Sequence, residues 1–243
     1  MVDRSRGPSS EARQRWRVVF ARDAAARFLA HLDAVTQWER ALRRAGVPVT
    51  LSQGNTPRPK LAFAAPLPLG MLGERELVDV VLAERLTLPS LRARLEGQLP
   101  AGYRLIDLFD VWLGEPAAAS RLAAADYRVA LRGASAAELA GAGQKLLGAD
   151  SLERARPKGE GRSVAYDLRP LLLELNVVDA PDPVASGAPA SARMRLRHAQ
   201  EGGAGRPEEV VLALGEALGR ELELELVVRE RLLAADELTR WPA

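Results

Sequence analysis

One order of predicted elements occurs twice along this 243-residue sequence, and that order limits the folds open to the chain. Each half runs strand, helix, extended stretches, helix, strand. In the first half these elements fall at 15–20, from Leu32 to Gly46, between Val47 and Leu82, from Thr87 to Pro100, and at 103–112. The order is that of the split βαβ arrangement of ferredoxin-like domains, with one extra hairpin.

The second half repeats the order without repeating the residues. Its elements are a strand at 127–131, a helix at 135–147, extended stretches at 152–156, 164–178 and 194–198, a helix at 208–218 and a strand at 222–228. Ser135 with Glu138 forms a capping-box pattern that favours a helix start there. We therefore predict an α+β fold of two tandem ferredoxin-like (split βαβ) domains.

The domain limits follow from composition. We expect a disordered lead at 1–13, a first domain at 14–113, an alanine-rich linker at 114–125, a second domain at 126–233 and a tail at 234–243. Hydrophobic residues make up 47% of the chain, which is enough to build two cores.

Composition also excludes several kinds of chemistry. The chain has no Cys, so disulfides, iron–sulfur clusters, thiolate metal sites and cysteine nucleophiles are ruled out. We find no His or carboxylate cluster at metal-site spacing, and we predict no metal and no cofactor. No apolar run long enough for a membrane span or a secretion signal occurs, so a cytoplasmic protein without a membrane partner is expected.

Positive charge is concentrated at the front of the chain. Residues 1–60 contain 12 Arg or Lys against 5 Asp or Glu, whereas the whole chain has a net charge of only +2. Of the 34 cations, 31 are Arg, whose planar guanidinium suits phosphate. A GC-rich genome would produce the same preference for Arg, but it would not produce the uneven distribution of charge.

The best candidate site is a basic group in the first domain, formed by a helix end and a proline-stiffened turn. Its predicted members are Arg40, Arg43, Arg44, Gln53, Asn55, Arg58 and Lys60. If the turn folds back beside the helix, the five cations would bind phosphates, and the two amides could contact base edges. The alternative is an ordinary solvated helix face beside a rigid turn.

Aromatic residues give little support to RNA recognition by a sheet surface. Modules of that kind stack two or three aromatics on their strands, and the stretch RPKLAFAAP offers only Phe63. Trp16, Phe28 and Trp38 are spaced like core residues, and we predict that all three are buried.

The segment from Phe28 to Gly70 carries four motifs in a fixed order: HLD at 31–33, ERALRRAG at 39–46, NTPRPK at 55–60 and PLPLG at 66–70. With these motifs the chain resembles a bacterial family of radical-SAM-linked proteins. Weaker matches follow at 158–172 and 205–219. Ala30 stands where that family usually has Ser, and Asn55-Thr56 replaces its Phe-Asn.

The resemblance implies an accessory role beside a radical SAM protein, often one with a cobalamin-binding region. A radical SAM site needs three cysteines, so the enzyme would be the partner, and we expect that this chain is not an enzyme. A basic accessory protein could present tRNA or rRNA to that partner. We therefore expect a non-catalytic, RNA-binding accessory protein.

Two alternatives remain open. The chain could be a protein-docking module that never touches RNA, with the PLPLG run and exposed sheet edges as its contacts. It could also be a metal-independent endoribonuclease, because tandem ferredoxin-like domains with a histidine near the first helix look like CRISPR repeat-processing enzymes. His31, two residues before Asp33, would then carry the proton.

Overall fold

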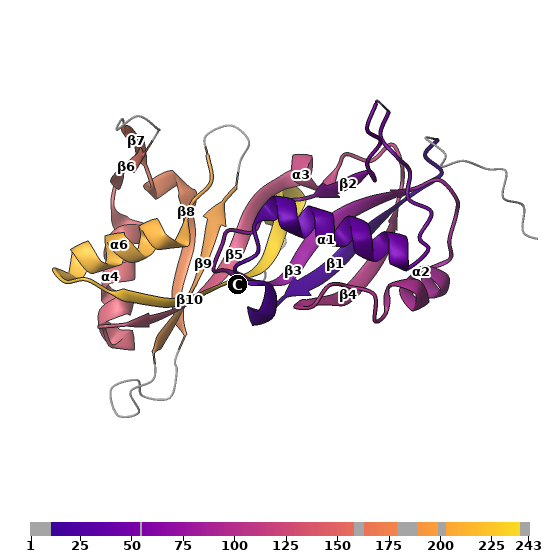
Figure 1. Ribbon diagram of the computed structural model, residues 1–243. Helices are drawn as coiled ribbons and strands as arrows, with labels where there is room; N and C mark the ends of the chain where they lie inside the picture. The colour runs from indigo at the N-terminus through magenta and orange to yellow at the C-terminus, as the bar shows by residue number, and fades with distance from the viewer. Residues whose placement is uncertain (1–10, 54, 158–162, 179–188, 199–202, 239–243) are drawn as a thin grey trace, which may run out of the picture. The chain divides into compact units, whose positions relative to one another are not determined.

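The computed structural model describes residues 11–53, 55–157, 163–178, 189–198 and 203–238 (Figure 1). Those residues form a mixed α+β structure, which confirms the predicted fold class at that level. The chain divides into two compact units, Met1–Arg121 and Leu122–Ala243, which are called unit 1 and unit 2 below. The division falls inside the stretch expected to be a linker.

The described part of unit 1 contains four strands and two main helices. Its elements are β1 (Gln14–Arg22), η1 (Ala24–Ala26), α1 (His31–Arg44), β2 (Leu61–Phe63), β3 (Leu72–Leu82), α2 (Leu88–Leu95), β4 (Tyr103–Val111) and α3 (Ala118–Arg121). Its strands lie in the order β4-β1-β3-β2, and every neighbouring pair is antiparallel. β1 pairs with β3 and β4, so the first strand of the unit is central in its sheet.

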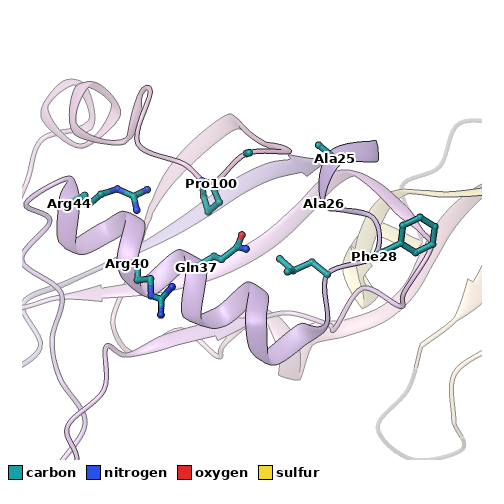
Figure 2. Close-up of a pocket in the computed structure, with 9 residues that line it drawn as sticks. Ala25, Ala26, Phe28, Gln37, Arg40, Arg44 and Pro100 are labelled. Carbon is teal, nitrogen blue, oxygen red and sulfur yellow. The ribbon is translucent and has the colours of Figure 1, made fainter.

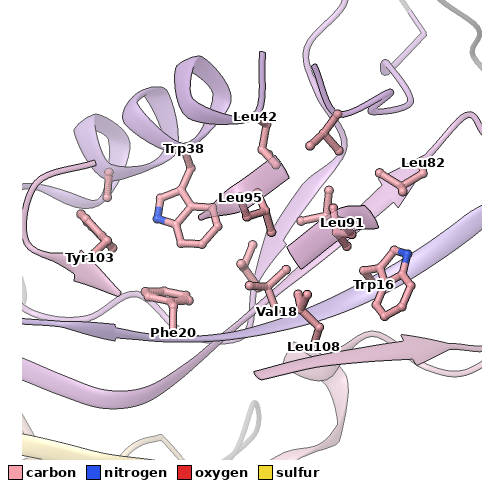
Figure 3. Packing of buried hydrophobic residues seen from close by; sticks show 14 of the residues in the cluster. Trp16, Val18, Phe20, Trp38, Leu42, Leu82, Leu91, Leu95, Tyr103 and Leu108 are labelled. Carbon is pink, nitrogen blue, oxygen red and sulfur yellow. The ribbon is translucent and has the colours of Figure 1, made fainter. Parts of the chain in front are cut away.

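The core of unit 1 lies between the sheet and its two helices (Figure 3). Alternate residues of β1, Trp16, Val18 and Phe20, point to one face of the sheet, as the period of a strand requires. Trp38 of α1 and Leu91 of α2 pack against that face and are almost fully buried. The predicted burial of Trp16 and Trp38 is therefore confirmed.

The first extended stretch of unit 1 is not a regular strand. Val49 and Leu51 form only isolated bridges, to Leu82 and Pro59. Prolines donate no backbone hydrogen bond, so this proline-rich region pairs residue by residue instead of forming a ladder. Only three residues of the second stretch, Leu61–Phe63, form a strand.

Unit 2 repeats the strand order of unit 1. Its elements are β5 (Leu122–Arg132), α4 (Ala136–Gly148), β6 (Glu153–Pro157), β7 (Ser163–Asp167), η2 (Arg169–Leu171), β8 (Leu172–Val178), β9 (Ala190–Arg197), α6 (Pro207–Leu218), β10 (Glu223–Ala234) and α7 (Ala235–Leu238). The main strands lie in the order β10-β5-β9-β8, again antiparallel, and β6 with β7 forms a separate hairpin. The predicted capping box of Ser135 and Glu138 is present at the start of α4.

Several boundaries in unit 2 differ from the sequence prediction, among them the start of β9, which is Ala190 and not Met194. The stretch 164–178 is interrupted by the 3-10 turn η2, where Pro170 lacks a backbone donor and the Asp167 carboxylate accepts from the backbone N–H of Arg169 at 2.9 Å. β5 begins at Leu122, so residues 122–125 of the expected linker belong to a strand. β10 runs to Ala234, and α7 follows it. Residues 1–10 of the expected lead and 239–243 of the expected tail lie outside the described residues.

Buried charge in unit 2 is held in a network on its sheet. The guanidinium of Arg195 donates to Asp126 at 2.7 Å and to Glu174 at 2.7 Å, and Arg231 also donates to Asp126. Burial alone would raise the pKa of Asp126, but the hydrogen bonds from the two arginines outweigh it and lower that pKa. Within the described residues, no helix is both long and apolar enough to cross a membrane.

Candidate nucleic-acid interface

A groove of about 600 Å³ lies along α1 in unit 1 (Figure 2). Three segments line it: η1 with the turn that follows, one face of α1, and the loop after α2. The lining residues are Ala25, Ala26, Phe28, Leu29, Gln37, Arg40, Arg44, Pro100 and Ala101. It is called the α1 groove below.

Helical spacing places the polar side chains of the α1 groove on one face. Gln37, Arg40 and Arg44 are three and four residues apart, so they lie above one another along the helix. The core face of α1 is formed by other residues, among them Trp38 and Leu42. Both arginines are exposed, and Arg44 Nη2 donates to the backbone carbonyl of Gln98 at 3.0 Å.

The two groove arginines have no carboxylate partner within ion-pair distance among the residues that the structure describes. Two arginines on the sheets are neutralised locally: Arg17 pairs with Asp79 at 2.8 Å, and Arg195 pairs with Asp126 at 2.7 Å. The described residues that line the α1 groove include no acidic side chain. The groove therefore presents uncompensated positive charge, which attracts an anion.

The turn before α1 is built around the buried guanidinium of Arg22, which is 3% exposed. Its Nε donates to Ala26 O at 2.9 Å, and its Nη2 donates to Arg27 O at 3.1 Å and to Leu29 O at 2.7 Å. These carbonyls flank Phe28. Arg22 thus fixes the backbone on both sides of that residue.

Phe28 itself is 74% exposed, so the prediction that it belongs to the core is wrong. It lies in the turn before α1, and the periodicity of the helix does not extend to it. Trp16 and Trp38, with which it was grouped, stand in a strand and a helix whose buried faces are defined. The ring of Phe28 lies at one end of the α1 groove and Arg44 at the other, with Gln37 between them (Figure 2).

The structure brings only two of the predicted site residues into the α1 groove, Arg40 and Arg44. Arg43 is exposed, but 3.6 residues per turn rotate it about 100° away from Arg44, and it does not line the groove.

The remaining predicted residues stand in the turn before β2. Gln53, Asn55, Arg58 and Lys60 are all exposed. The turn is closed by backbone hydrogen bonds from Ser52 N to Arg58 O and from Lys60 N to Thr50 O, both at 2.8 Å. None of these four residues lines the α1 groove.

His31 is the first residue of α1 and does not line the α1 groove. Its ring packs edge-on against Phe63, with the centroids 5.5 Å apart. The imidazole is half-buried against an aromatic ring and lies outside the set of cations described above.

A second, smaller cavity of about 270 Å³ lies between α2 and β4. It contains acidic as well as basic side chains, Glu96 beside Arg92 and Arg104, and Arg92 pairs with Asp107 at 3.6 Å. Tyr103 also lines it, and burial raises the pKa of its hydroxyl. The balance of charge makes this cavity a weaker anion site than the α1 groove.

Sequence reasoning missed Phe28, Gln37 and the buried Arg22. The spacing of Gln37 from Arg40 and Arg44 could have identified that side chain, because all three share a helix face. Nothing local marks Arg22, since its partners are carbonyls whose direction depends on the folded turn.

Fold and site together define an α+β protein whose first unit carries a cationic groove with an exposed aromatic ring. Residues 15–207 match the model of a family described as an uncharacterized protein conserved in bacteria, DUF2344. The chain therefore belongs to this bacterial family. A search of curated proteins found no match.

Solved structures similar to this chain include the following two. One chain in the crystal structure of a Cbf5-Nop10-Gar1 complex shares 11% identity with a TM-score of 0.52, covering 98% of this chain and 57% of that chain. This chain thus spans little more than half the length of that relative, and the likeness bears on the fold alone. An unknown protein from Galdieria sulphuraria shares 18% identity, with coverages of 87% and 97%, but its TM-score is only 0.28.

Proposed function

We propose that this chain is a non-catalytic RNA-binding accessory protein and that the RNA backbone lies in the α1 groove. One observation carries the proposal: Arg40 and Arg44 line one groove and have no carboxylate partner among the described residues. Phosphates bound there would replace the missing carboxylates as partners of the two guanidinium groups. Binding would release counterions from the RNA and so depend on salt.

The proposed partner is a radical SAM enzyme, in keeping with the motifs HLD, ERALRRAG and PLPLG described above. Such an enzyme would supply the three cysteines that this chain lacks, and a cobalamin-binding region where it has one. In this arrangement the accessory protein binds tRNA or rRNA and the partner performs the reaction.

We also infer that both units are ferredoxin-like. The strand orders β4-β1-β3-β2 and β10-β5-β9-β8 are the same when each unit is numbered from its own first strand. Each unit places its first strand at the centre, between its third and fourth strands, and this supports the split βαβ assignment.

The test compares two double variants of the full chain. Arg40→Gln/Arg44→Gln removes the cations of the α1 groove, and Arg75→Gln/Arg85→Gln removes the same charge from exposed arginines of unit 1 that do not line it. Affinity for a labelled oligouridylate is measured by fluorescence anisotropy over a series of KCl concentrations. We expect the groove variant to lower the slope of log K against log salt by about 1.4, at about 0.7 per lost phosphate contact.

The control variant should keep the parental slope. Equal losses in the two variants would mean that the chain responds only to net charge, and the α1 groove would not be the binding site. Absence of any shift with the parent protein would remove RNA binding altogether.

A docking module is the second candidate, because Leu69 of the PLPLG run is 62% exposed. If the chain only docks a protein, the radical SAM partner should co-purify with it after nuclease treatment, and the Arg40→Gln/Arg44→Gln variant should retain the complex. Crosslinking the chain in cell extract and sequencing the attached RNA separates this candidate from the first.

A further inference from the structure

The exposed ring of Phe28 is held in place on one side. Arg27 Cζ lies 4.9 Å from the centroid of the ring, a cation–π contact. Arg27 is itself fixed, because its Nε donates to Gly70 O at 3.2 Å and its carbonyl accepts from Gly70 N at 2.7 Å. Gly70 has a φ of +82°, and a Cβ there would lie 3.9 Å from the ring.

The backbone beneath the ring is also fixed. Arg22 binds the carbonyls of Arg27 and Leu29, the two neighbours of Phe28, from within the core. A ring so constrained loses little further conformational freedom when a ligand packs on its open side. The turn therefore presents a large apolar surface to solvent in an ordered position.

The place of this ring in the α1 groove indicates what it could bind. Phe28 lies at one end of the groove, and the Gln37 amide, Arg40 and Arg44 follow it in that order along the groove (Figure 2). An aromatic face and cations along one groove are the combination that binds single-stranded nucleic acid, with bases stacked on the ring and phosphates on the cations. The backbone positions of Arg40 and Arg44 are about 6 Å apart along the helix axis, so the two cations follow one another along the groove.

We propose that the α1 groove takes a single-stranded segment of RNA, one unpaired base of which stacks on Phe28. This inference rests on the proposed function and names its substrate class. A base inside a duplex has both faces covered by its neighbours and cannot stack on a side chain without leaving the helix. Loops, bulges and strand ends are therefore the targets.

The experiment replaces the ring in the full chain. Phe28→Ala removes the stacking surface, Phe28→Trp keeps it, and Phe109→Ala removes another exposed aromatic of unit 1 that lies outside the groove. Each variant is titrated with labelled oligouridylate and with its duplex with oligoadenylate, under one salt condition. Circular dichroism checks that each variant is folded, as expected for changes at exposed positions.

We expect the parent to prefer the single strand. Phe28→Ala should weaken oligouridylate binding about tenfold and leave duplex binding unchanged, because one base–aromatic stack is lost. Phe28→Trp should bind as the parent does and show tryptophan fluorescence that oligouridylate quenches more than in the parent. Phe109→Ala should bind as the parent does.

The outcomes separate this inference from the function on which it rests. If Phe28→Ala binds the single strand as well as the parent, while Arg40→Gln/Arg44→Gln still weakens binding, the inference is overturned and the proposed function stands. The same holds if Phe28→Ala releases a protein partner but not RNA, since Phe28 would then be a protein contact. If the parent binds neither the single strand nor the duplex, the proposed RNA-binding function is wrong, and this inference is wrong with it.

Discussion

Arg22 shows how one buried side chain can determine a surface that it does not reach. Its guanidinium is buried within unit 1 and donates hydrogen bonds to the carbonyls of Ala26, Arg27 and Leu29. Ala26 O and Arg27 O also accept from Leu29 N and Gly70 N, whereas Arg22 is the donor to Leu29 O. A buried carbonyl without a donor costs more free energy than its hydrogen bond contributes, so the turn depends on Arg22 most at Leu29. The orientation of Phe28 and the shape of the α1 groove therefore depend on a residue of β1.

We predict that Arg22→Met lowers the free energy of unfolding by about 2 kcal/mol, because methionine fills the space but removes the hydrogen bonds that Arg22 donates to the three carbonyls. Ala26 O and Arg27 O keep Leu29 N and Gly70 N as donors, whereas Leu29 O loses the donor that Arg22 supplies. Urea unfolding followed by circular dichroism measures this as a lower midpoint with an unchanged m-value. Arg75→Met, at an exposed position of β3, serves as the control and should stay within about 0.5 kcal/mol of the parent. A loss of the same size in both variants would show that the hydrogen bonds of Arg22 are not the cause.

At the level of single residues, burial could be predicted from the sequence where a regular period relates position to burial. Trp16 and Trp38 stand in regular elements, so their burial followed from strand alternation and helical spacing. Phe28 stands in a turn, where no period relates position to burial, and it was placed in the core by mistake. Among the described residues, Arg17 has a carboxylate partner and Arg40 has none, and this difference depends on tertiary contacts that sequence spacing does not encode.

Elements were predictable where local signals agree with packing. The capping box marks the start of α4, and the apolar spacing marks the core face of α1. Strand limits were less predictable because they depend on pairing partners. β10 continues to Ala234 because it pairs with β5. η2 interrupts the stretch 164–178 where the Asp167 carboxylate accepts hydrogen bonds from backbone N–H groups. The pairing partner β5 is remote in the sequence, whereas Arg169, one of the donors to Asp167, is only two residues away.

Within α4, two glycines in similar local sequence should respond oppositely to alanine. A Cβ at Gly141 would meet nothing within 4 Å, whereas a Cβ at Gly143 would lie 3.2 Å from Leu175 Cδ2 in the core. We predict that Gly141→Ala raises the free energy of unfolding by about 0.5–1 kcal/mol, because alanine has less freedom to lose in a helix. Gly143→Ala should give no gain. Thermal unfolding of both variants checks this, and equal shifts would show that packing at position 143 is irrelevant.

On the scale of the whole molecule, the two units share a strand order but differ in charge. α1 and α4 each follow the central strand of their unit, so they occupy equivalent places in the topology. α1 carries Arg40, Arg43 and Arg44, whereas the sequence of α4 contains a single cation, Lys145. The repeated strand order was predictable because the hydrophobic pattern of the sequence follows the core. The charged groove was predicted only in part, because the placement of surface charge is independent of the hydrophobic pattern.

This asymmetry predicts that RNA binding belongs to unit 1 alone. Lys145→Gln/Arg132→Gln removes two positive charges from unit 2, one from α4 and one from an arginine that already pairs with Glu225. Because a paired arginine releases few counterions, this variant should bind oligouridylate within about twofold of the parent, with the same salt slope. The Arg40→Gln/Arg44→Gln variant, with the same net charge, should lose both affinity and slope. A similar loss in the two variants would mean that the chain attracts RNA through its overall field, and the α1 groove would then have no special part in binding.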